Sequence, residues 1–279
     1  MSIADKYFRE AVKEILEHGS SDEGQKVRAH WPDGTPAHTK KTFCYICRYK
    51  PAEEFPILTL RKQAFKGMVK ELLWIWRDKS NNIKDLDSHI WDAWADKDGS
   101  IGKAYGYQLK KLYKFPEGLR DQVDHLIYEL KNNPASRRII TNIYNFEDLH
   151  QMKLYPCVFE TMWDVSDGKL NMTLVQRSGD LLAAAGPGGW DCAQYALLQM
   201  MIAQVCGLKV GEFVHVINNL HIYDRHIPLV KKILKNSEQN APTVKINPNV
   251  KDFYDFKLED FELVDYKAPK LEDTFEVAE

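Results

Sequence analysis

Hydrophobic and polar positions along this chain repeat with two different periods, and each period predicts its own kind of element. Apolar side chains recur at the spacing of one helix face in five segments, 5–18, 66–77, 121–132, 191–206 and 226–236. Apolar and β-branched residues alternate as in strands in six others, 42–49, 138–144, 157–165, 169–177, 212–219 and 259–266. The chain is therefore expected to mix helices with strands.

The order of these elements indicates the fold class. Two strand segments flank Asp167-Gly168, a pair typical of the tight turn of a β-hairpin. This favours an antiparallel or mixed sheet over repeated strand–helix–strand units. No internal repeat interrupts the 279 residues. We predict an α+β fold, a single domain over residues 1–279 with a large mixed or antiparallel sheet flanked by helices.

Charge and composition limit the partners of this domain. Lys and Arg number 38 against 40 Asp and Glu, giving a net charge of −2, so no global excess would attract DNA or an anionic membrane. An anionic ligand would need a local basic cluster. No stretch reaches the roughly 18 apolar residues of a membrane span, and the N-terminal segment is an amphipathic helix pattern. We expect a cytoplasmic protein.

Five cysteines, an odd number, do not form a regular disulfide framework. Cys44 and Cys47 make a CxxC pair, but there is no second pair at zinc spacing and the segment alternates like a strand. A plain strand is favoured over a zinc or redox site, and no metal is expected.

Cys157 opens an apolar strand, where a lone cysteine is most often a buried structural residue. Arginines suggest another role: Arg137 and Arg138 begin one predicted strand, Arg177 ends another, and Arg28 lies in an early polar loop. Guanidinium groups bind phosphate and lower the pKa of a nearby thiol, so their convergence would make Cys157 a nucleophile beside an anionic ligand. For each arginine alone, a solvated surface charge is the alternative.

Nine segments, in order and in register, resemble the thymidylate synthase family. They are FPILTLRK (55–62), KELLWIW (70–76), HIWDAWADKDGSIGKAYG (89–106), NNPASRRII (132–140), LYPC (154–157), QRSGD (176–180), QYALLQMMIAQV (194–205), HIYDRH (221–226) and DFYDFKLEDFEL (252–263). The resemblance implies a homodimer of α+β subunits with a sheet face at the dimer interface. It also implies one-carbon transfer from 5,10-methylenetetrahydrofolate, a cosubstrate, to C5 of a pyrimidine nucleotide 5′-monophosphate.

The resemblance assigns roles to particular residues. C5 of a pyrimidine is too weak a nucleophile to attack the folate methylene, so a thiolate first adds at C6, and Cys157 matches that thiolate. Arg28 and Arg177 match phosphate ligands of the same subunit, whereas Arg137 and Arg138 match those supplied by the partner subunit.

Two further positions match groups that handle protons. Glu71 lies in a stretch that is apolar nearly all round and is expected to be buried; it matches the glutamate that organises water and moves protons at the base. Tyr105 matches the tyrosine that assists proton removal at C5, with a core aromatic as the alternative.

The remaining matches complete the two binding sites. Those for the nucleotide are Ser178 at the phosphate, Gln176 beside the nucleotide, and His221 and Tyr223 at the sugar 3′-hydroxyl. Those for the folate are Trp91 and Trp94 lining the site, Asp180 at the pterin, Arg61 at a lysine position facing the tail, and Ala278 in the C-terminal segment.

One position departs from the family pattern. Where the family has an asparagine that recognises uracil at the start of a helix, this chain has a longer loop, residues 181–190, followed by Asp191. Uracil presents an N3–H donor and an O4 acceptor, which a carboxamide complements; cytosine presents the reverse, which the O–H and C=O of a protonated Asp complement. A mismatch costs roughly 1–3 kcal/mol for each unsatisfied group.

We therefore predict dCMP as the substrate and C5 hydroxymethylation or methylation as the reaction. The chain ends in Glu279 where the synthases end in an aliphatic residue, which favours entry of water over hydride transfer. The alternative is thymidylate synthase, converting dUMP to dTMP with dihydrofolate as by-product. Asp191 has two other interpretations, a helix N-cap or an engineered replacement of Asn. A homologue without catalysis and a Cys/His hydrolase are less favoured, since the matched residues are intact and no His/Asp partners surround Cys157.

Overall fold

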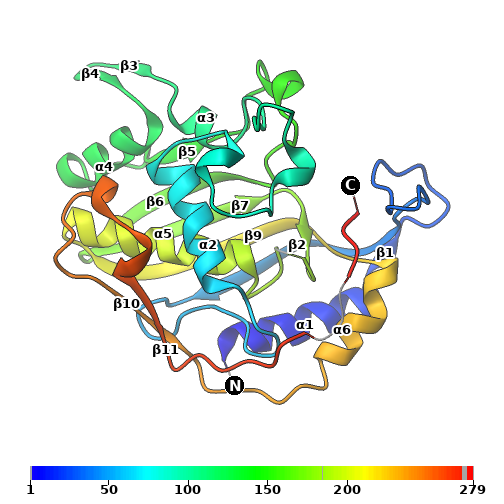
Figure 1. Ribbon diagram of the computed structural model, residues 1–279. Coiled ribbons are helices and arrows are strands. Elements are labelled where there is room, and N and C mark those ends of the chain that lie inside the picture. The colour runs from blue at the N-terminus through cyan, green and yellow to red at the C-terminus, as the bar shows by residue number, and fades with distance from the viewer. Residues whose placement is uncertain (1, 184, 272–274, 279) are drawn as a thin grey trace.

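A computed structural model describes residues 2–183, 185–271 and 275–278. Its centre is a seven-stranded sheet in the order β1-β2-β9-β7-β6-β5, with β8 paired to β9 (Figure 1). The strands of this sheet are β1 Ser20–Ser21, β2 Thr39–Tyr49, β5 Ile140–Asn142, β6 Val158–Ser166, β7 Lys169–Gln176, β8 Gly179–Asp180 and β9 Lys209–Tyr223. Strands β7 and β8 run parallel to β9 and the other pairs are antiparallel, so the sheet is mixed, as predicted.

The predicted hairpin joins β6 to β7. Ser166 pairs with Lys169 across a two-residue turn. Asp167 and Gly168 have φ of 51° and 70°, the positive values that a type I′ turn requires at both central positions. The turn sets the register of the two strands from Ser166 to Glu160. A bulge between Val158 and Glu160 then shifts it by one residue, and the relative positions of Cys157 and Arg177 depend on both features.

Helices cover one face of the sheet (Figure 1). They are α1 Ile3–His18, α2 Phe65–Leu72, α3 Gly106–Leu109, α4 Gln122–Asn132, α5 Trp190–Cys206 and α6 Ile227–Ile233. Helix α5 is buried along most of its length, packs on β7 and β9, and ends where Gly207 adopts φ 69°. Helix α2 packs on α5, so residues of both helices meet above the sheet.

The predicted elements exist, but several boundaries differ. The helix expected over 66–77 changes at Leu73 into a π-helical segment, Leu73–Arg77, in which the Asp78 N–H donates to the Leu73 carbonyl at 2.9 Å. The strand expected over 212–219 extends to Lys209–Tyr223, whereas those expected over 138–144 and 259–266 shorten to β5 and to β11, Phe261–Val264. Five short strands were not predicted: β1, β8, β3 Tyr113–Phe115, β4 Gly118–Arg120 and β10 Thr243–Ile246.

The CxxC segment lies in β2, in agreement with the strand interpretation. Cys47 is buried and Cys44 is partly exposed. In the part of the chain that the structure describes, no helix has both the length and the apolar character to cross a membrane.

Candidate active site

Cys157 directly precedes β6, and its neighbour across the sheet, Arg177, directly follows β7. The Arg177 N–H donates to the Cys157 carbonyl at 2.9 Å. The guanidinium of Arg177 donates to the carbonyls of Pro156 and Tyr155 at 2.8 and 2.7 Å, and its Nη2 lies 3.8 Å from the Cys157 Sγ. The chain thereby holds a positive charge against the thiol.

Burial nevertheless raises the pKa of the Cys157 thiol. Arg177 and Arg28 act in the opposite direction, and the charge of Asp191 adds to the rise. The arginines thus lower this pKa as expected, but their effect is smaller than the cost of desolvating a thiolate, so the pKa of the thiol is raised in the chain without ligands.

The four arginines do not all meet within one chain. Arg28 is exposed, in the loop before β2, and its charge acts on both Cys157 and Tyr223. Arg137 and Arg138 are also exposed, and they line a hollow of about 660 Å³ at the end of α4. A single chain thus brings Arg177 and Arg28 toward Cys157 and presents Arg137 and Arg138 on another part of its surface.

Tyr105 lies on the other side of Cys157. Its hydroxyl accepts the Cys157 N–H at 3.4 Å, and its ring packs edge-on against Trp91 with centroids 5.0 Å apart. Burial raises the pKa of Tyr105 well above its usual value, so the hydroxyl keeps its hydrogen at neutral pH. Its φ of 46° is a backbone conformation that side-chain-bearing residues rarely adopt.

Glu71, in the last turn of α2, is 7% exposed, as its apolar surroundings predict. Three side chains donate to its carboxylate: Trp91 at 2.6 Å on Oε1, and Gln194 at 2.8 Å and Trp190 on Oε2. Burial raises the pKa of Glu71, while the three hydrogen bonds oppose that rise. A buried carboxylate with a raised pKa can act as a general acid or base toward a bound ligand.

Asp191 is partly buried, lies in the first turn of α5, and directs its carboxylate against Gln176. Gly189 is the N-cap of α5 and Asp191 is the second helical residue, so the N-cap interpretation is wrong. Gln176 Nε2 donates to Asp191 Oδ2 at 2.9 Å. Burial, and after it the charge of Glu71, raises the pKa of Asp191 to about 7. Both protonation states are therefore populated near neutral pH.

The loop before Asp191 is fixed against the N-terminal helix. Gly188 has φ of 69°, its carbonyl accepts the Leu58 N–H at 2.8 Å, and a Cβ on it would lie 2.7 Å from the Ala4 Cβ. Only glycine satisfies both the conformation and the close approach.

The residues expected at the sugar and phosphate lie on neighbouring strands. His221 and Tyr223, near the end of β9, have ring centroids 5.2 Å apart. His221 Nδ1 contacts Asn219 Oδ1 at 3.1 Å, and burial lowers its pKa. Ser178, between β7 and β8, contributes its carbonyl to Gln176 Nε2 at 2.9 Å.

The residues expected at the folate form a second group. Asp180, in β8, accepts the N–H groups of Leu182 and Ala183 at 2.9 and 3.3 Å, and its pKa is lowered despite burial by His226, His221 and a backbone N–H. Arg61 is 8% exposed, and the attraction of Asp180 opposes the lowering of its pKa by burial. Such a carboxylate and cation suit the polar atoms of a reduced pterin.

Trp94 packs edge-on against Trp91, one of the donors to Glu71, with centroids 5.7 Å apart. Ala278 is partly exposed near the C-terminus, while Glu279 lies outside the described residues. The indoles and the carboxylate of Asp180 are groups that fit a flat heteroaromatic ring.

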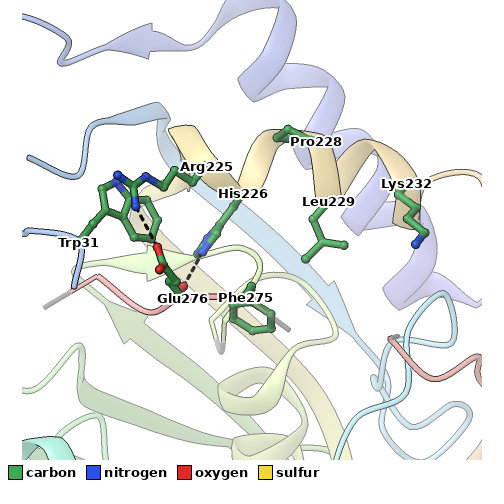
Figure 2. A pocket seen from close by; sticks show the side chains of 8 residues that line it. All are labelled: Trp31, Arg225, His226, Pro228, Leu229, Lys232, Phe275 and Glu276. Carbon is green, nitrogen blue, oxygen red and sulfur yellow. Dashed lines mark hydrogen bonds and ion pairs between the residues drawn. The ribbon is translucent and has the colours of Figure 1, made fainter. Parts of the chain in front are cut away.

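The C-terminal segment packs near Asp180, one of the residues expected at the folate. A cavity of about 390 Å³ lies between this segment, α6 and the loop before β2. Figure 2 shows the side chains that line it. Arg225 bridges its rim, with Nη1 2.9 Å from Glu276 Oε2, Nη2 2.7 Å from Asp33 Oδ2, and its guanidinium 4.9 Å above the Trp31 ring. The Glu276 carbonyl lies 2.8 Å from His226 Nε2, and His226 contacts Asp180. The segment is thus connected through His226 to Asp180.

Sequence reasoning missed three residues of this region, Trp190, Gln194 and His215. The first two donate to Glu71, and His215 Nε2 lies 2.7 Å from Gln176 Oε1. The sequence could have indicated Gln194, because a polar residue on a helix that is apolar all round needs a buried partner. Nothing in the local pattern distinguished His215 from other alternating residues of its strand.

Comparisons with known proteins agree with this geometry. The family model described as thymidylate synthase matches residues 6–278. The chain is 46% identical over 284 residues to thymidylate synthase of Bacillus licheniformis, covering 100% of both chains, and 45% identical to that of Clostridium beijerinckii, covering 96% of both.

Among solved structures, thermostable thymidylate synthase A from Bacillus subtilis superposes with a TM-score of 0.92 at 45% identity, covering 98% of this chain and 99% of that one. The fold is accordingly the α+β fold of that enzyme. The chain belongs to the thymidylate synthase family of one-carbon transferases.

Proposed function

We propose that this chain transfers a one-carbon unit from 5,10-methylenetetrahydrofolate to C5 of a pyrimidine deoxynucleotide 5′-monophosphate, through a bond between Cys157 Sγ and C6. The single observation that carries the proposal is the cluster around this thiol: Arg177 and Tyr105 contact Cys157, the charge of Asp191 acts on it, and the charge of Glu71 acts on Asp191.

Each group has a defined part in the reaction. Loss of the thiol proton, favoured by Arg177, gives the thiolate that adds to C6 and makes C5 nucleophilic. The folate supplies the methylene carbon and, for methylation, the hydride. Glu71 exchanges protons at the base, and Tyr105 assists removal of the C5 proton. Elimination of the Cys157 thiolate then restores the ring.

The base that the comparisons favour is uracil. Relatives that share 46% of their residues over the full length are named thymidylate synthase, which supports conversion of dUMP to dTMP with dihydrofolate as by-product. This departs from the expectation of dCMP drawn from Asp191, and we place dUMP first.

Cytosine remains a second candidate because of one specific observation. Asp191 has a pKa of about 7, so a substantial fraction is protonated at neutral pH and can donate one hydrogen bond and accept another. That pattern complements cytosine N3 and N4, whereas the ionised carboxylate repels uracil O4.

The enzyme works as a homodimer, and the dimer completes the phosphate site in this proposal. Apolar side chains are exposed along the sheet on the side away from α5, among them Phe43 at 81%, Ile46 at 49% and Met162 at 37% exposure. A second copy covering this face would bring its own Arg137 and Arg138 to the phosphate that Arg177 and Arg28 bind.

The test incubates the protein with methylenetetrahydrofolate and dUMP or dCMP, and follows dihydrofolate absorbance and product mass. Methylated dUMP with stoichiometric dihydrofolate supports the first candidate; a methyl or hydroxymethyl group on dCMP supports the second. Asp191→Asn should move the preference toward dUMP. Absence of any product from both nucleotides would contradict one-carbon transfer.

A further inference from the structure

His215 is a buried titratable residue for which the proposed reaction has no role. It lies in β9, beside Cys47 of β2 and Leu174 of β7, and is 0% exposed. Burial lowers its pKa to about 3, so the imidazole is neutral and carries one N–H at neutral pH. Its Nε2 faces Gln176 Oε1 at 2.7 Å, and its Nδ1 has no hydrogen-bond partner within the described residues.

The hydrogen-bond partners fix every hydrogen in this chain of contacts. The Ser178 carbonyl can only accept, so the Gln176 atom that lies 2.9 Å from it is the amide nitrogen. Gln176 Oε1 then faces His215, which must carry its hydrogen on Nε2. A hydrogen on Nδ1 would be buried without an acceptor, at a cost of about 1–3 kcal/mol.

The second hydrogen of the Gln176 amide points at Asp191 Oδ2, 2.9 Å from Nε2. Oδ2 is therefore an acceptor, and the proton of the neutral carboxyl resides on Oδ1. This matters because a free carboxylic acid carries its proton on either oxygen and can complement either pyrimidine edge. When one carboxyl oxygen is always the donor and the other always the acceptor, the carboxyl complements the edge of either uracil or cytosine, but not of both, in a given placement of the base.

We propose that His215 is a specificity-positioning residue: through Gln176 it confines the Asp191 proton to Oδ1, so that the enzyme accepts one of uracil and cytosine and discriminates against the other. His215 does not touch the base and acts only through Gln176. The inference rests on the proposed function in one respect, that Asp191 contacts the base.

The experiment compares dUMP with dCMP for the full-length protein, by the ratio of kcat/KM and by the ratio of dissociation constants. His215→Leu removes the donor, leaves Gln176 Oε1 unsatisfied, and should reduce the wild-type selectivity ratio about tenfold, the equivalent of one hydrogen bond. Gln176→Leu should reduce it as much, and the double variant no further, because the two residues act in series.

Two polar variants keep the test independent of folding. His215→Gln places an N–H near the Nε2 position and should restore selectivity, whereas His215→Asn reaches only the Nδ1 position and should not. The thermal unfolding midpoint of each variant checks that it folds.

Three results would overturn the inference: equal affinity of the wild type for both nucleotides, an equal loss for both in His215→Leu, or equal selectivity of the Gln and Asn variants. Because binding ratios are measured as well as turnover, a protein that binds nucleotides selectively but forms no product would contradict the proposed reaction and leave this test intact.

Discussion

Trp190 donates its indole hydrogen to Glu71 Oε2, across 119 residues of sequence, and thereby joins the start of α5 to the end of α2. This bond stabilises the ionised form of Glu71 against a burial cost that raises its pKa.

Trp190→Phe should therefore raise the pKa of Glu71 further. If the reaction needs ionised Glu71, the acid limb of the kcat/KM profile should move to higher pH by about half a unit to one unit. The measurement is the pH dependence of dihydrofolate formation. Trp94→Phe is the control, since its ring packs on Trp91 and, among the described residues, has no hydrogen bond to Glu71. An acid limb that does not move in Trp190→Phe would contradict the role of this bond.

Asp191→Asn should change the pH dependence of stability. The pKa of Asp191 is about 7 in the folded chain and 3.8 in its ordinary environment, so the folded state binds the proton more tightly. The stabilisation of the folded state by this proton is fully present below about pH 4 and is lost as the pH rises toward 7. The variant has no such proton, and its advantage in thermal unfolding midpoint should grow from pH 5 to pH 8.

The control for this comparison is Asp98→Asn, at an exposed position. The thermal unfolding midpoint of this variant should differ from that of the wild type by a constant amount between pH 5 and pH 8. Parallel stability curves for Asp191→Asn and the wild type would show that the carboxyl titrates normally in the fold.

Cys157→Ala should abolish exchange of the C5 hydrogen of the nucleotide, because without the Sγ–C6 bond C5 has no carbanion character. Release of tritium from 5-tritiated dUMP and dCMP measures this step without requiring methyl transfer. Cys206→Ala, at the end of α5, should retain release at the wild-type rate. Persistent release in Cys157→Ala would refute the nucleophile.

Arg225→Gln should weaken the attachment of the C-terminal segment, since Arg225 pairs with both Glu276 and Asp33. These groups are exposed, so the effect is modest: about a threefold rise in KM for the folate, diminished at high salt. Glu276→Gln should give a similar rise and the double variant no more. Additive effects would show that the two residues act separately.

The pattern of apolar and polar residues predicted the fold class, but it did not predict the side-chain contacts that shift the pKa values in the site. The period of 66–77 predicted a helix and the burial of Glu71, because an element that is apolar all round has no solvated face. The donors to Glu71 come from α5 and from residue 91, contacts that only tertiary packing creates.

Two features of the site depend on tertiary packing in the same way. Whether Cys157 is a thiol or a thiolate depends on how far burial outweighs Arg177, a difference of two large terms that no spacing reveals. The N-cap is Gly189, so Asp191 lies in the first turn of α5, and its carboxylate accepts a hydrogen bond from Gln176, a contact between two distant segments of the chain.

The contact of Gly188 with Ala4 and Leu58 has a consequence for protein engineering. The loop that delivers Asp191 is clamped by the first helix and by the segment before α2, with no space for one additional methyl group. Transplanting this loop into a relative would fail unless both supporting segments moved with it, and truncating the N-terminal helix would disturb nucleobase choice from the opposite end of the sequence.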